Sequence, residues 1–246
     1  MPPPDRRLSC IICAFNEAPR IGAVLAVASV HPLLDEVIVV DDGSTDGTSE
    51  IVRSFPSARL ISYARNRGKS CAMAAGIAAA TNDFLMLLDA DLKGLVADNL
   101  TALAAPVLSG RADVSISLRR NSLRIYRAMG IDFVSGERVI RKELLSEALI
   151  DMRGLPRFGI EAFMNERIIA RKLSIAVVRW PRVTQARKTE KIGRWRGIWA
   201  ECRMLRDVLQ VTYPLAAISQ TYHMRSLRIP VDQRSTVEGK SGAYPF

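Results

Sequence analysis

The stretch Phe84-Leu-Met-Leu-Leu-Asp-Ala-Asp-Leu92 decides the fold. Its run of apolar residues predicts a short strand buried on both faces, as in a parallel sheet covered by helices. Two carboxylates, Asp89 and Asp91, follow with Ala90 between them. Unpaired carboxylates at a core edge are costly to desolvate, and their oxygens suit Mg²⁺ or Mn²⁺. The pattern favours a metal–diphosphate site, and a solvated turn is the alternative.

The whole chain is long enough for one large domain with an elaboration. It has 246 residues, of which 48% are hydrophobic, so it can bury a full core. No apolar run approaches the roughly 18–20 residues of a membrane span. The first seven residues lack a signal-peptide pattern. The Cys10/Cys13 pair lies in an apolar run without a second pair, so we expect reduced thiols in a cytoplasmic protein.

The net charge of +10 is unevenly distributed. Residues 1–100 hold 9 Lys/Arg and 12 Asp/Glu, whereas residues 101–246 hold 26 and 13. Such asymmetry indicates an anionic partner for the second part: a phosphorylated substrate, a membrane surface or a nucleic acid. The second part has no aromatic–basic stacking pattern, so nucleic acid is not the partner that we expect.

Strand and helix patterns alternate along the chain, which predicts an α/β fold with a mostly parallel sheet. Further strands are expected at residues 8–14, 36–40, 58–63, 112–118 and 173–179, with helices between them. Polar residues follow the first strands, where ligands bind in such folds. After the first strand come Asn16 and Glu17; Asn16 could be a helix N-cap, a residue of the ligand site, or both. After the second come Asp41 and Asp42, which fit hydrogen bonds to a base or a ribose.

A basic glycine turn follows the third strand. Gly68, Lys69 and Ser70 resemble part of a P-loop, but that pattern needs a glycine where Tyr63 stands. The turn opens an alanine-rich helix, so its backbone amides and the Lys69 charge still suit an anion. A surface lysine without a ligand is the alternative.

The second half is basic and carries an amphipathic pattern. Residues 181–196 form a basic loop, and apolar residues recur at helical spacing from Trp195 through Trp199 to Leu209. A basic, Trp-bearing helix can lie on an anionic membrane surface or pack on its own domain. Residues after 225 are expected to form a weakly structured tail.

Four ordered motifs resemble the family 2 glycosyltransferases of the GT-A fold. They are Ala14-Phe-Asn-Glu17, Val39-Val-Asp-Asp-Gly-Ser-Thr-Asp-Gly47, Asn66-Arg-Gly-Lys69 and Asp89-Ala-Asp91. The resemblance implies a nucleotide-sugar donor and a Mg²⁺ or Mn²⁺ site at Asp89 and Asp91. Donor binding is implied at Ala14, Phe15, Glu17, Asp41, Asp42, Gly68, Lys69 and Ala90.

The second half looks like glucosyl-3-phosphoglycerate synthases and their relatives at Ser135-Gly-Glu137 and Phe158-Gly-Ile-Glu161. The resemblance implies catalytic or acceptor-positioning roles for Glu137 and Glu161, beside Asp91. Relatives often carry a histidine after the last strand as a metal ligand, and Gln185 stands in the nearest matching stretch. Gln185 or water would then complete the metal's ligands, or metal dependence would be weaker. Inversion or retention at the anomeric carbon stays open.

We therefore expect a metal-dependent hexosyltransferase that uses a UDP-sugar in preference to a GDP-sugar. Its acceptor would be phosphorylated, with polyprenyl phosphate or another lipid as one form. Residues 1–118 would bind the donor, residues 119–225 the acceptor, and residues 226–246 would form the tail. The alternatives are a catalytically degenerate GT-A protein and a nucleotidyltransferase. The place where nucleotidyltransferases carry a glycine-rich loop holds Ala14-Phe-Asn-Glu17, which disfavours the latter.

Overall fold

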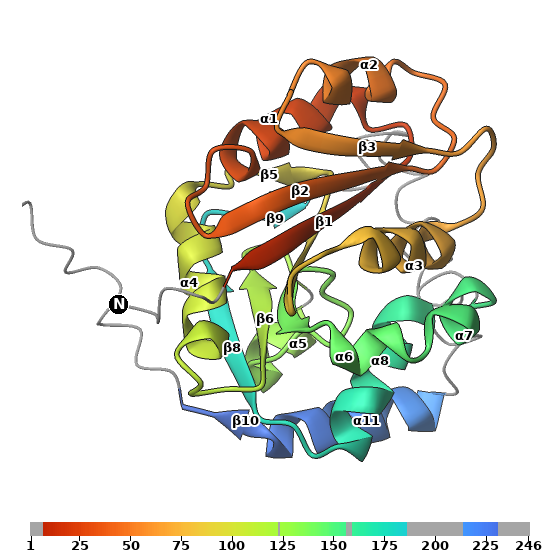
Figure 1. Ribbon diagram of the computed structural model, residues 1–246. Helices are drawn as coiled ribbons and strands as arrows, with labels where there is room; N and C mark the ends of the chain where they lie inside the picture. Colours follow the sequence, from red (N-terminus) through yellow and green to blue (C-terminus); the bar gives the residue numbers. More distant parts are fainter. Residues whose placement is uncertain (1–6, 123, 156–158, 186–213, 231–246) are drawn as a thin grey trace, which may run out of the picture.

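The computed structural model describes residues 7–122, 124–155, 159–185 and 214–230 (Figure 1). Eight strands form one sheet in the order β10-β8-β6-β7-β4-β1-β2-β3, and β5 pairs with β9 in a separate ribbon. The strands are β1 (Leu8–Ala14), β2 (Leu34–Asp41), β3 (Ala58–Ser62), β4 (Phe84–Asp89), β5 (Leu92–Lys93), β6 (Val114–Arg119), β7 (Arg138–Arg141), β8 (Ile175–Trp180), β9 (Thr184–Gln185) and β10 (Arg228–Ile229). The mostly parallel α/β fold is confirmed.

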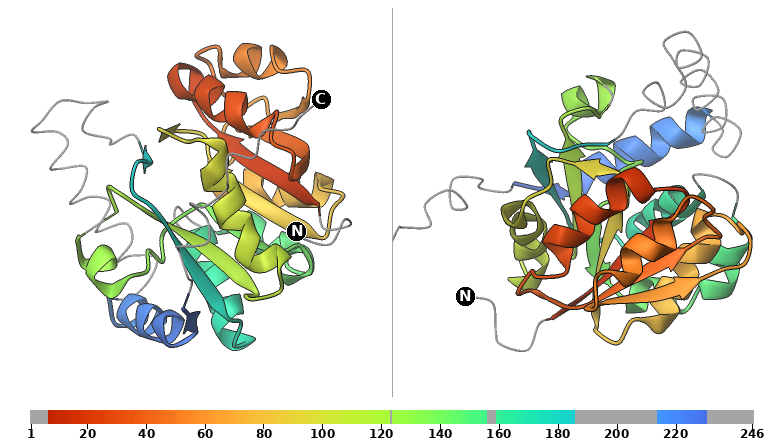
Figure 2. Two further views of the ribbon diagram at one scale, coloured as in Figure 1. Left: turned by 90° about the vertical axis from the view of Figure 1, so that its left-hand side faces the viewer. Right: turned by 90° about the horizontal axis from the view of Figure 1, so that it is seen from above.

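Helices cover both faces of the sheet (Figures 1 and 2). The described helices are α1 (Ala18–Ala28), α2 (Thr48–Arg53), α3 (Lys69–Ala79), α4 (Ala97–Leu108), α5 (Arg124–Met129), α6 (Glu143–Ser146), α7 (Leu149–Arg153), α8 (Gly159–Ala170) and α11 (Pro214–Ser226). Side chains of α1, α2 and α4 pack into the hydrophobic cluster on one face. Those of α3, α6, α7, α8 and α11 pack into the cluster on the other. This double cover explains why β4 is buried along its whole length.

The strand β7 was not expected from the sequence. It runs antiparallel between β4 and β6, with Arg138 opposite Leu87 of β4 and Ile116 of β6. An antiparallel strand begins where its parallel neighbours end. The turn that precedes β7, Ser135-Gly-Glu137, therefore lies at the carboxyl ends of β4 and β6.

Two local expectations were wrong. Asn16 is not the N-cap of α1, because that position is Glu17. Asn16 instead adopts a positive φ of 53° and accepts a hydrogen bond from the Thr45 amide, since the chain must turn sharply towards the loop after β2. The tail expected from residue 226 includes β10, which pairs with Ile175 and Ala176 of β8.

The helix expected around Trp195 and Trp199 lies outside the described residues. Pro214 is the first residue of α11. Within the described ranges, no helix combines the length and the apolar character that crossing a membrane requires.

The close approach of α3 to the sheet predicts a steric effect at Gly76. A Cβ atom there would lie 2.5 Å from Cγ2 of Ile11, whereas one on Gly22 in α1 would lie 3.6 Å from Cγ2 of Ile51. We expect Gly76→Ala to lower the free energy of unfolding by about 1–3 kcal/mol through overpacking. The matched control Gly22→Ala should be neutral or stabilising by roughly 0.5–1 kcal/mol. Urea denaturation measures both, and equal stability of the two variants would contradict this packing.

Candidate functional site

Parallel strands bring the sequence-predicted residues to one edge of the sheet. Cys13 of β1 lies beside Asp89 of β4, and Ala14 lies beside Asp41 of β2. The carboxyl ends of these strands therefore meet, as ligand sites of open α/β sheets require. Ala14 and Ala90 are buried there, and Phe15 next to Ala14 is 45% exposed.

Asp42 holds the loop that precedes α3. Its two carboxylate oxygens accept hydrogen bonds from the Arg67 amide (2.7 Å) and the Gly68 amide (2.8 Å). Gly43 permits this contact, because a Cβ there would lie 2.5 Å from the carbonyl carbon of Arg65. The loops that carry two of the predicted donor-binding motifs are thus locked together.

Asp41 and Glu17 are also engaged within the protein. Asp41 accepts hydrogen bonds from the Ser44 amide (2.9 Å) and the Ser49 hydroxyl. The Glu17 carboxylate pairs with Arg20 in the first turn of α1. These contacts order the turns around the site, and nucleotide binding by Asp41, Asp42 and Glu17 stays a prediction.

Lys69, the first residue of α3, bridges two carboxylates. Its Nζ atom lies 2.8 Å from Oδ1 of Asp89 and 2.8 Å from Oε1 of Glu161 on α8. Burial opposes the charge of Lys69, but the two carboxylates outweigh it and raise the pKa of Lys69 well above its ordinary value. Burial likewise opposes the charge of Asp89, and Lys69 and Arg119 outweigh it and lower the pKa of Asp89.

Arg119 is a second internal cation, and the sequence reasoning missed it. Its Nη1 atom lies 2.9 Å from Glu137 and 3.7 Å from Asp89, and its Nη2 atom lies 3.6 Å from Asp132. Arg119 ends β6, so its place at the carboxyl end of an expected strand was the available signal.

The two predicted catalytic glutamates differ in what their oxygens contact. Glu137 is completely buried and accepts hydrogen bonds from Ser117 (2.6 Å), Ser135 (2.7 Å) and Arg119. Burial raises the pKa of Glu137 despite the charge of Arg119. Glu161 is 3% exposed, and its Oε2 atom has no hydrogen-bond partner among the described residues. Glu161 thus keeps an oxygen for a ligand.

Gln185 spans the space between Asp89 and Arg119. Its amide nitrogen donates to Oδ2 of Asp89 (3.0 Å), and its amide oxygen accepts from Nη1 of Arg119 (2.8 Å). The β5–β9 ribbon places it there, because Gln185 pairs with Leu92, the residue after Asp91. The histidines His31 and His223 lie elsewhere: His31 bonds to α4, and His223 is on α11.

The two aspartates of the Asp-Ala-Asp motif have different surroundings. Asp89 is enclosed by Lys69, Gln185 and Arg119, and a Cβ on Gly136 would lie 2.5 Å from its Oδ1 atom. Asp91 is only partly buried. No group of three or more metal-binding side chains is found in the described part of the chain. Since Mg²⁺ is often held by one or two carboxylates and substrate phosphates, this donor set fits a metal that arrives with a diphosphate.

A thiol nucleophile is disfavoured at this edge. Cys13 lies beside Asp89, and burial raises its pKa to about 12. A thiol with such a pKa stays protonated and weakly reactive near neutral pH. Cys10, Cys13 and Cys71 are free, as expected.

Comparisons with known proteins agree with this geometry. Residues 9–128 match the family model described as glycosyl transferase family 2. A dolichyl-phosphate beta-glucosyltransferase from Trichomonas vaginalis is 29% identical over 150 residues, which are 50% of this chain and 44% of that protein. An undecaprenyl-phosphate 4-deoxy-4-formamido-L-arabinose transferase from Aeromonas hydrophila is 32% identical over 46% of this chain and 37% of its own length. The chain thus spans less than half the length of these curated relatives.

Solved structures match over a larger share. Glucosyl-3-phosphoglycerate synthase from Mycobacterium tuberculosis in complex with phosphoglyceric acid has a TM-score of 0.62 at 25% identity, over 74% of this chain and 72% of that chain. The same enzyme with Mn²⁺, UDP-glucose and phosphoglyceric acid gives 0.61 at 25% identity, over the same shares of the two chains.

The Lys69 bridge predicts a pH-dependent effect on stability. Lys69→Met would leave Asp89 and Glu161 without their shared cation and should cost roughly 1–3 kcal/mol at pH 8, after allowance for the 40% exposure of the lysine side chain. The loss should shrink as the pH falls towards 5, because Asp89 loses in the variant the cation that lowers its pKa and is relieved by protonation. In the wild type, the lowered pKa of Asp89 keeps it ionised there.

Arg53→Met is the control, since it removes the exposed partner of Glu50. It should change the free energy of unfolding by less than about 0.5 kcal/mol at either pH. Denaturation curves at pH 8 and pH 5 test both variants. A penalty for Lys69→Met that does not change with pH would count against the bridge.

Proposed function

Because the chain has the GT-A fold and is related to the family 2 glycosyltransferases, we propose that it transfers a hexose from a nucleotide diphosphate sugar to a phosphorylated acceptor. The observation that carries this proposal is the junction of Lys69, Asp89 and Glu161. It lies at the edge of the sheet where the motifs of the first half converge. A basic side chain, a buried aspartate and a glutamate with an unused oxygen thus meet at this edge.

The donor diphosphate would lie between Asp91 and the amino-terminal end of α3. Asp91, with Asp89 behind it, would hold Mg²⁺ or Mn²⁺ together with the phosphates, and such a metal stabilises the charge of the leaving nucleotide. The backbone amides that open α3 and the Lys69 ammonium suit the same anion. Phe15 offers an exposed ring for the nucleotide base at the end of β1.

Glu161 is the general base in this proposal. Its Oε1 atom is held by Lys69, and its Oε2 atom would accept the proton when the acceptor attacks through a hydroxyl. A lipid phosphate would attack through a phosphate oxygen and would not need this base. The three hydrogen bonds of Glu137 suit a positioning role, because they fix Arg119 beside Asp89. A role of Glu137 as the base would require those bonds to break.

The names of the relatives guide the choice of substrates. Glucosyl-3-phosphoglycerate synthase is solved with UDP-glucose, which favours uridine over guanosine. Its acceptor is a phosphorylated acid, whereas the curated relatives are named for dolichyl and undecaprenyl phosphate. A phosphorylated acceptor is common to both groups, and the lipid is one form of it.

Thermal-shift screening with UDP, GDP and their sugars tests the donor site. A ligand that binds only the folded state raises its melting temperature. We expect a rise with UDP or a UDP-sugar that grows when Mn²⁺ is added and is larger than the rise with GDP. If the folded protein responds to neither nucleotide, a catalytically degenerate GT-A protein takes the place of this proposal.

Asp91→Asn tests the catalytic role of the motif. We expect sugar transfer to fall at least about 100-fold, since the charge that holds the metal and the leaving group is lost. The melting temperature should stay within about 2 °C of wild type, because Asp91 is partly exposed. Asp151→Asn is the control on exposed helix α7 and should keep full activity. Near-normal turnover by Asp91→Asn would remove the metal–diphosphate site from the mechanism.

A further inference from the structure

Three arginines from three segments lie on the side of the sheet that carries α11, and the charges of Arg225 and Arg179 both act on Arg228. Arg179 is on β8, Arg225 is on the last turn of α11, and Arg228 begins β10. Arg179 and Arg225 are exposed, and Arg228 is half-buried. The α11–β10 segment lies at the bottom of Figure 1, remote from α1, α2 and β3.

The strand register places these side chains on one face. Arg228 of β10 pairs with Ile175 of β8 in parallel register, so their side chains point to the same side of the sheet. Arg179 follows Ile175 by four residues on β8, so it points to that side as well, roughly 13 Å further along the strand, and only its long side chain can reach towards Arg228. Met224 packs into the hydrophobic cluster on this face, which brings the neighbouring Arg225 to it.

Arg228 is held in a shaped position. Its Nη1 atom donates to the carbonyl oxygen of Met129 (3.0 Å), and a Cβ on Gly130 would lie 2.6 Å from the same Nη1 atom. A side chain at residue 130 would therefore displace this guanidinium. Its Nε atom is buried and has no hydrogen-bond partner among the described residues. A buried donor without a partner is rare and calls for an acceptor that the described chain does not supply.

The cluster also lacks an opposing charge. None of the three arginines forms an ion pair with a carboxylate of the described residues, and Arg225 and Arg179 add to the effect of burial in lowering the pKa of Arg228. Like charges held together are unfavourable unless an anion joins them. Arginine forks match phosphate oxygens in geometry as well as in charge.

We infer that Arg179, Arg225 and Arg228 form a phosphate-binding site, separate from the donor site, whose ligand is a free phosphate or the phosphate of a lipid headgroup. Tyr222 supports the second source, since it is 73% exposed on α11, one turn before Arg225. An exposed tyrosine beside arginines is typical of a surface that meets a membrane interface.

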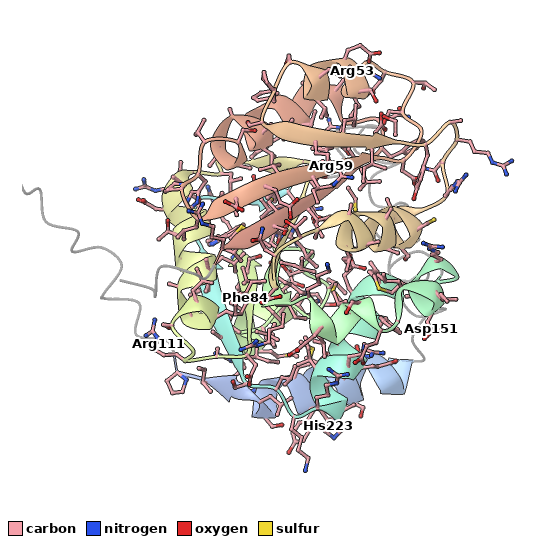
Figure 3. The ribbon with its side chains drawn as sticks, in the orientation of Figure 1. Arg53, Arg59, Phe84, Arg111, Asp151 and His223 are labelled. Carbon is pink, nitrogen blue, oxygen red and sulfur yellow. The ribbon has the colours of Figure 1, made fainter. Side chains whose placement is uncertain are left out.

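The test uses the full chain and a charge-matched pair of double variants. Arg179→Glu with Arg225→Glu reverses two charges in the cluster. Arg53→Glu with Arg59→Glu makes the same change at exposed positions at the other end of the molecule (Figure 3). The first measurement is the melting temperature in inorganic phosphate against chloride at equal ionic strength. The second is co-sedimentation with phosphatidylcholine vesicles that do or do not contain about 30% phosphatidylglycerol, at roughly 0.15 M salt.

We expect phosphate to raise the melting temperature of the wild type and of the control, but not that of the cluster variant. For a lipid source, affinity for the anionic vesicles should fall at least tenfold in the cluster variant and less than twofold in the control. Loss of the phosphate effect with unchanged vesicle binding would assign a free phosphate. Equal losses in both double variants, or a wild type that responds to neither probe, would overturn the site.

The thermal shift produced by the nucleotide shows whether the donor site is still intact in the cluster variant. The cluster variant should retain that shift in full, because the described partners of Asp89 are Lys69, Arg119 and Gln185 and neither substituted arginine is among them. Arg225→Gln removes one charge without reversing it and serves as a milder second variant. It should weaken the phosphate effect, and a full effect in this variant would count against a role for Arg225.

Discussion

The bridge from Lys69 to Asp89 and Glu161 is the interaction on which the site depends. Carboxylates brought to one edge of a sheet repel one another and lose hydration, so they stay ionised together only if cations are interleaved with them. Lys69 opens α3 and joins β4 to α8, and Arg119 joins β4 to the turn before β7. The same two cations therefore balance charge and set the spacing of the strands and helices around the ligand position.

Most of the first half could be predicted from the sequence, because its signals are local. The apolar run before Asp89 identifies a strand covered on both faces, and parallel strands must end at a common edge. That reasoning alone brings Asp41, Asp89 and the turn before Lys69 together. It did not reveal that Asp42 is engaged by the amides of the next loop, since such hydrogen bonds depend on how two turns pack.

The structure of the second half was harder to predict because it depends on contacts between residues that are far apart in the sequence. The short strand β7 pairs with β4 and β6, and neither pairing produces a periodic pattern of apolar residues that could be recognised in the sequence. Its first residue, Arg138, is fully buried and bonds to the carbonyls of Ser135 and Phe133 and to Asn165 of α8. Burial lowers the pKa of Arg138 to about 10, which still leaves it charged near neutral pH. A buried arginine with acceptors from separate segments can be identified only in the folded chain.

Gln185 determines which atoms of the site are already engaged within the protein, because it bonds to both Asp89 and Arg119. A carboxamide has both a donor and an acceptor, so Gln185 can donate a hydrogen bond to Asp89 and accept one from Arg119 at the same time. A side chain with only donors or only acceptors could not do both. That arrangement commits Asp89 to the protein, whereas Asp91 is the more exposed of the two aspartates. A single aspartate provides too few oxygen ligands to bind a divalent ion tightly in water, but the oxygens of a diphosphate can complete the coordination. Metal and donor should then bind cooperatively, because each provides ligands that the other lacks.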